Sequence, residues 1–237
     1  MSLLTIVQGA AAELGLPLPV QVFASNDPAV IVLRQLADKE GKELARRFDW
    51  QVVQREATFI TVAAETQVTN ILSNWPDFGH IVSQSMWDRS QSKPVYGPLT
   101  MTEWQMKKSA AAQAGYAQWY RIRANALLFF PTPGAGETVA FEYISRNWCL
   151  SVNLQAQPGF SSDGDSSLID EEIVRLGVVW RFKKAKGFDY SEDFRTYEMA
   201  LADVFGPDSG RPAVDMTGDT GMNLFGINIP EGNWNIT

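Results

Sequence analysis

Few residues in this sequence could carry catalysis. The chain holds one histidine, His80, and one cysteine, Cys149. His80 follows a turn marked by Pro and Gly, which favours a loop or strand-edge residue, since a catalytic histidine also needs a nucleophile and an orienting acid. Cys149 lies between Trp148 and Leu150, where a packed thiol is expected. A zinc site of the usual ligands is excluded within one chain.

Paired carboxylates are the remaining route to hydrolysis. The candidates are Asp88, Glu103, Glu137 and Glu142, which fall on predicted strands, a turn and a helix. Nothing in their spacing shows that two of them meet, as a glycosidase would require. We therefore assign no catalytic residue, and a carboxylate-based hydrolase stays the weaker alternative.

Two short motifs resemble ligand loops without completing them. The run 163–167 opens like a calcium loop, but Leu168 stands where Gly is needed and Val174 where Glu is needed. Gly134 and Gly136 suggest a phosphate loop, but no Gly-Lys-Ser/Thr follows and no helix opens there. No metal and no cofactor are predicted.

Composition places the chain among globular proteins. Its 237 residues are 45% hydrophobic and include 8 Trp, enough for one sizeable core or a core plus a smaller module. The net charge of -7 does not suit a general nucleic-acid binder. The single cysteine indicates synthesis in a reducing compartment. Residues 1–7 lack the basic region of a signal peptide, and no apolar run reaches membrane-span length.

Helical patterns occupy both ends of the chain. Residues 3–14 form an apolar helix candidate, and Asp27 with Pro28 begins a second helix that ends near Asp49. From Ser167, a third apolar stripe ends at Gly187, and a fourth helix follows. The last two helices, joined by a short turn, predict an antiparallel pair.

Strand patterns occupy the middle. Residues 51–62 and 81–89 are β-branched or alternating, and 119–130 and 138–150 are two strong strands joined by a Pro/Gly turn that predicts a hairpin. A short helix is predicted over 102–113, with Thr102 and Gln105 at capping-box spacing. The fold class is therefore α+β. The predicted domains are a helical bundle (1–49 with 167–205), an inserted β-sandwich or barrel (50–166) and an extended C-terminal arm (206–237).

Two segments are candidates for binding partners. The arm is rich in Gly and Pro but carries scattered apolar residues, which suits a segment that docks on another chain. Its candidate contact residues are Leu224, Phe225, Ile227, Ile229, Trp234 and Ile236. A second candidate is a basic run that either complements a helix dipole or faces DNA or an acidic partner. Its residues are Arg181, Lys183, Lys184 and Lys186.

Several short sequence segments resemble the head-to-tail adaptor proteins of short-tailed bacteriophages. The stretches that carry the resemblance are Leu33–Trp50, Trp87–Arg89, Gly97–Thr100, Glu103–Trp104 and Asp170–Gly187. The resemblance covers residues 1–205 and implies a non-catalytic virion protein, made in the host cytoplasm and not in a membrane. It further implies a ring of about twelve copies beneath the portal protein, an arm docked on the portal, and a tail or nozzle protein below. Genomic DNA would pass through the lumen without sequence-specific binding.

A glycan-binding module of a tail fibre is the main rival. Its support is the number of aromatic residues in the predicted β region, which could stack on sugars but more commonly fill cores. These residues are Trp75, Trp87, Trp104, Trp119, Tyr120, Tyr143 and Trp148.

Overall fold

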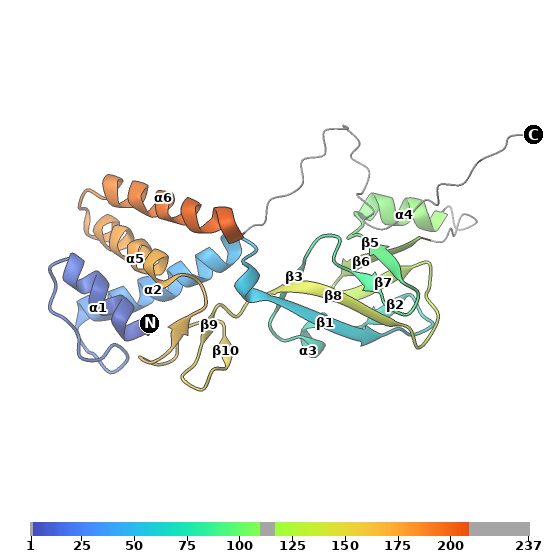
Figure 1. The fold of residues 1–237 in the computed structure, drawn as a ribbon, viewed down its shortest axis with the longest axis horizontal. Coiled ribbons are helices and arrows are strands. Elements are labelled where there is room, and N and C mark those ends of the chain that lie inside the picture. Colours follow the sequence, from blue (N-terminus) through green and yellow to red (C-terminus); the bar gives the residue numbers. More distant parts are fainter. Residues whose placement is uncertain (1, 110–116, 209–237) are drawn as a thin grey trace, which may run out of the picture.

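The computed structural model describes residues 2–109 and 117–208. Helices from both ends of the chain form one lobe, and a β-rich middle forms the other (Figure 1). The helices are α1 (Leu3–Glu13), α2 (Pro28–Arg47), α3 (Ile71–Asn74), α4 (Met101–Ser109), α5 (Glu171–Lys186) and α6 (Ser191–Asp208), with a 3-10 turn, η1 (Gln51–Val53). The strands are β1 (Gln54–Ile60), β2 (Thr66–Val68), β3 (Phe78–Ile81), β4 (Trp87–Asp88), β5 (Lys93–Tyr96), β6 (Gln118–Arg123), β7 (Ala126–Phe130), β8 (Thr138–Ser145), β9 (Cys149–Leu150), β10 (Ala156–Gln157) and β11 (Ser166–Ser167).

Helix α5 is the centre of the helical lobe. It packs against α1, α2 and α6, so its apolar residues point in several directions. Val174 lies in the core shared with Tyr197 of α6, whereas Val178 and Phe182 lie in the core shared with α1 and the first half of α2. The fold is α+β, as the sequence predicted.

The start of α2 follows its predicted cap, since the Asp27 carboxylate accepts the Ala29 N–H at 2.8 Å. Helix α5 begins later than the predicted Ser167: Ser166 and Ser167 form β11, and Asp170 caps the helix by accepting the Glu172 N–H at 2.8 Å. Gly187 ends α5 with φ +78°, a left-handed conformation that favours glycine. The α5–α6 antiparallel pair is confirmed by their contact along the lobe.

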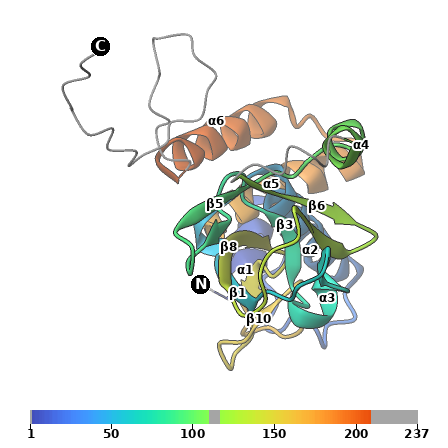
Figure 2. The ribbon, with the colours of Figure 1, turned by 90° about the vertical axis from the view of Figure 1, so that its right-hand side faces the viewer.

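One curled, mixed sheet makes the β lobe. Its order is β1-β8-β4-β5-β6-β7-β2, with β3 also paired to β8. All its pairs are antiparallel except β5 with β6. Figure 2 shows the curled strands end-on, and the side chains between them form one core. Phe129, Phe141 and Tyr120 fill this core, each at most 1% exposed.

The predicted hairpin between residues 130 and 138 is wrong. Residues 119–130 are two strands, because Ala124 and Asn125 both have positive φ (+50° and +61°) and turn the chain between β6 and β7. Strand β7 pairs with β6 and β2, whereas β8 pairs with β1, β3 and β4. The Pro/Gly segment 131–137 therefore crosses between two parts of the sheet.

Two other predicted elements are displaced. The capping box of α4 is formed by Thr100 and Glu103, two residues earlier than predicted: the Thr100 N–H donates to Glu103 at 2.8 Å. Residues 110–113 of the predicted helix lie outside the described part. The strand predicted over 81–89 is interrupted, since Gln84 has φ +60° and pairing resumes only at Trp87.

The segment after β8 packs with the helices. Trp148 and Cys149 belong to the core formed by α2, α5 and α6, and Phe160 packs against it. Trp148 reaches α2 at Gly41, where an added Cβ would lie 2.2 Å from the indole. The predicted domain limits stay a prediction, and this packing favours a β lobe that ends before Trp148.

Candidate partner-binding surfaces

Two residues of the predicted basic run on α5 form ion pairs within the helical lobe. Arg181 has a side chain only 10% exposed and forms ion pairs with Glu40 and, at 3.0 Å, with Glu43 of α2. Lys183 donates to both oxygens of Asp193, at 2.7 and 2.8 Å. These two cations hold α5 against α2 and against the start of α6.

The Glu40 carboxylate lies at the centre of this arrangement. It is fully buried and accepts hydrogen bonds from Arg181 and from the Tyr197 hydroxyl, at 2.5 Å. Burial raises the pKa of Glu40, while the hydrogen bond from Tyr197 and the charge of Arg181 oppose the rise. The cluster joins α2, α5 and α6, and this explains it without a catalytic role.

Lys184 and Lys186 differ from the rest of the basic run because they are exposed. The Lys184 ammonium lies 5.6 Å from the Trp180 ring centroid, and Lys186 lies 5.5 Å from that of Phe182. Of the four predicted residues, these two could meet a partner. The other predicted contact residues, Leu224, Phe225, Ile227, Ile229, Trp234 and Ile236, lie outside the described part of the chain.

A second basic surface lies where the two lobes meet. A hollow of about 510 Å³ opens there, and we call it the junction groove. It is lined by Lys42, Ala45, Arg46, Gly79, His80, Ile144, Ser145, Arg146, Trp148 and Pro158. The lining holds three permanent cations, one histidine and no carboxylate, in a chain of net charge -7.

The floor of the groove is apolar and rigidly built. Ile144 and Trp148 are buried, and the Trp148 indole donates to the Pro158 carbonyl at 2.9 Å. Strand β3 approaches β8 so closely that a Cβ on Gly79 would lie 2.6 Å from the Ile144 carbonyl oxygen. His80 therefore projects from an edge that only glycine at position 79 permits.

The basic side chains of the groove differ in whether they have an acidic neighbour. Lys42 pairs with Asp38 at 2.5 Å, and His80 lies 3.0 Å from the Asp49 carboxylate. Arg46 and Arg146 are exposed, and neither has an ion-pair partner within residues 2–109 and 117–208. Their two guanidinium groups are thus available to an acidic partner.

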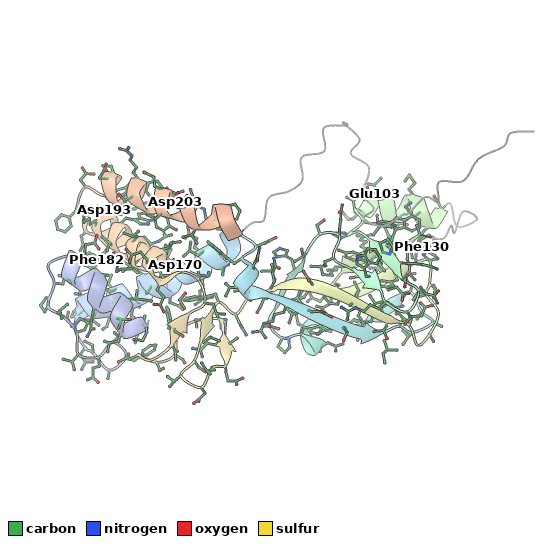
Figure 3. All side chains as sticks on the ribbon, in the orientation of Figure 1. Glu103, Phe130, Asp170, Phe182, Asp193 and Asp203 are labelled. Carbon is green, nitrogen blue, oxygen red and sulfur yellow. The ribbon has the colours of Figure 1, made fainter. Side chains whose placement is uncertain are left out.

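The carboxylates weighed for hydrolysis do not all lie together. Glu103 caps α4, at the opposite end of the molecule from Asp193 (Figure 3). Glu142 lines a second hollow, of about 630 Å³, on the outer face of the sheet, which we call the outer-sheet hollow. Its lining is Glu56, Ser85, Trp87, Asp88, Arg89, Ser92, Ala140, Phe141 and Glu142.

Asp88 and Glu137 are the two candidates that meet. Asp88 is 1% exposed and accepts the Ser90 and Gln91 N–H groups, at 2.9 and 3.0 Å. Burial and the neighbouring Asp88 raise the pKa of Glu137, and Gln91 donates to Glu137 at 3.1 Å. Asp88 thus shapes the β4–β5 turn, and the Gln91 amide of that turn links it to Glu137 in the segment before β8.

The incomplete ligand motifs have structural explanations. Asp163 accepts the N–H groups of Val22 and Phe23, at 3.0 and 2.8 Å, and joins the α1–α2 connection to the loop before β11. Burial raises the pKa of Cys149 to about 11, so its thiol stays protonated. Across the described ranges, no three potential metal ligands converge on one point.

A comparison with known protein families places the chain in one family. The model of the family described as SU10 adaptor protein matches residues 1–215. The chain belongs to the SU10 adaptor protein family. No curated protein matches it.

Membership identifies the chain as a phage head-to-tail adaptor, a virion component that interacts with portal and tail proteins in general. An adaptor family indicates a structural protein. Among the helices described, none is long and apolar enough to cross a membrane.

The junction groove is the feature of this adaptor that the sequence did not reveal. Its cations come from α2 and from the residue that follows β8, so no local run contains them. The spacing of Lys42 and Arg46, four residues apart, was the one available signal, since it places both on one side of a helix.

Proposed function

We propose that this adaptor forms a closed ring of about twelve copies beneath the portal and joins it to the tail or nozzle protein. In this proposal, residues 209–237, the part of the predicted arm that follows α6, dock on the portal. The family match over residues 1–215 carries the proposal. The arm's mixture of Gly, Pro and scattered large apolar residues supports the docking role.

The positions of exposed apolar side chains on the helical lobe suit a ring. In a closed ring each copy uses two different patches, one for each neighbour. Exposed apolar side chains lie on α6, where Met199 is 59% exposed, and on the β9–β10 loop, where Val152 and Leu154 are 65% and 76% exposed. Figures 1 and 2 place this loop across the lobe from α6.

The charge of the chain suits a DNA channel. With a net charge of -7, the wall of the ring would repel the phosphate backbone, so that genomic DNA passes without sticking. No sequence-specific contact is required for this role.

Binding to purified portal rings tests the proposal. The full chain should co-sediment with the portal, whereas a chain that ends at Asp208 should bind at least about tenfold more weakly, because it lacks the arm. Equal binding by the two chains would contradict arm docking. Failure of both to bind would contradict the adaptor ring itself.

One observation favours a glycan-binding role as a second candidate. Trp87 is 42% exposed in the outer-sheet hollow, beside Glu56 and Glu142, an arrangement able to stack a sugar ring and accept its hydroxyls. The other aromatics weigh against it, since Trp104, Trp148 and Tyr120 are at most 1% exposed. A glycan array with wild type and Trp87→Ala would decide.

A further inference from the structure

We infer that the junction groove is a holding site for residues 209–237 of the same chain, which keeps the arm docked on its own copy until the portal displaces it. The inference goes beyond the proposed ring and portal docking, because it concerns the free chain. It is carried by the charge of the groove, its apolar floor and the position at which α6 ends.

Charge complementarity is the first argument. The groove presents Arg46 and Arg146 without acidic partners in the described part of the chain, and its lining includes no carboxylate. Residues 209–237 contain Asp215, Asp219 and Glu231 against the single cation Arg211. An acidic segment is therefore attached to a protein whose junction groove is cationic.

The apolar floor is the second argument. Between the cations, Ala45, Ile144 and Trp148 give the groove a non-polar base. The segment also carries large apolar residues, among them Phe225 and Trp234. A groove with a cationic rim and an apolar base matches an extended segment of this composition better than it matches a bare phosphate backbone.

The end of α6 is the third argument. Phe205, in the last turn of α6, stacks on Phe48 with ring centroids 4.0 Å apart. Asp49, which follows Phe48 in the sequence, pairs with His80 on the groove lining. The segment thus leaves α6 next to the groove, and at about 3.3 Å per extended residue it is long enough to enter. Its own copy is the nearest occupant.

Chymotrypsin cleavage of the full-length free chain tests the inference, with cleavage after Phe225 followed by intact mass. The double variant R46E/R146E should be cleaved about fivefold faster than wild type, and added salt should accelerate cleavage of the wild type alone. The control K184E/K186E has the same change in net charge, on α5, and should be cleaved at the wild-type rate. Circular dichroism of each variant confirms that the lobes stay folded.

Equal rates for wild type and R46E/R146E would overturn the inference. So would a wild-type rate that falls as protein concentration rises, because the segment would then dock on another copy. Portal binding is measured separately. If residues 209–237 of the free wild-type chain are unprotected but the chain still binds the portal, the holding site is excluded and the proposed function stands.

Discussion

The Tyr197 hydroxyl donates a 2.5 Å hydrogen bond to the fully buried Glu40 carboxylate. The two residues lie 157 positions apart in sequence, on α6 and α2, and Arg181 of α5 completes the cluster. A buried carboxylate without partners would be strongly destabilising, so the three helices are tied to one arrangement.

Loss of Arg181 should destabilise the helical lobe. Arg181→Met leaves Glu40 without its cation, and we expect a loss of about 3 kcal/mol in the free energy of unfolding. Urea denaturation followed by circular dichroism measures the loss. Lys184→Met, at an exposed position on the same helix, should change stability by less than about 0.5 kcal/mol. Equal stabilities for the two variants would show that the buried pair contributes nothing.

Gly177 should not tolerate a methyl group. An added Cβ would lie 2.4 Å from the Glu40 Cδ, so Gly177→Ala should cost about 1–3 kcal/mol, although Ala is usually the better helix former. Gly206→Ala is the matched control, because nothing lies within 4 Å of its Cβ position. Thermal melts should show a lower melting temperature for Gly177→Ala and a higher one for Gly206→Ala. Stabilisation by both substitutions would contradict the packing described.

Asp165 should make the chain sensitive to acid. Burial works against its charged form, but hydrogen bonds from Ser162 and Ser161 outweigh burial and lower the pKa from 3.8 to about 2. A carboxyl group whose pKa is lower in the folded state stabilises the fold at pH values above its ordinary pKa. For Asp165 this contribution to the free energy of unfolding is about 2 kcal/mol, and it is lost as the pH falls from 3.8 toward 2.

The variant Asp165→Asn isolates this contribution. At neutral pH it should be less stable than wild type by about 2 kcal/mol, and its stability should fall less steeply between pH 4 and pH 2. Urea midpoints measured across this range give the comparison. Parallel curves for the two proteins would mean that another group controls the acid response.

The Cys149 thiol should react only when the chain unfolds. It is 0% exposed and its pKa is raised to about 11, so little thiolate forms at pH 8. A disulfide reagent should label the native chain at least about a hundredfold more slowly than the chain in urea. Rapid labelling of the native chain would place the thiol at the surface.

Local signals allowed the helices to be predicted from the sequence. Asp27 and Gly187 act within one turn of the helix ends they specify, so their effect can be read without knowing the fold. The α+β class followed from the order of these helices and the strands between them.

Strand pairing and the junction groove required the fold. Ala124 and Asn125 form a turn without Gly or Pro, so a continuous strand was the simpler interpretation. The Pro/Gly segment 131–137 has hairpin composition but crosses between strands that do not pair. Arg46 and Arg146 line one groove only because the lobes lie against each other, which no spacing in the sequence records.

Electron microscopy of particles from a phage lysate with this gene deleted tests the adaptor role most directly. The account predicts heads that package DNA but lack tails and lose their genomes. Expression of the full chain should restore tails, whereas a chain that ends at Asp208 should not. Complete, tailed particles in the absence of the gene would contradict the account.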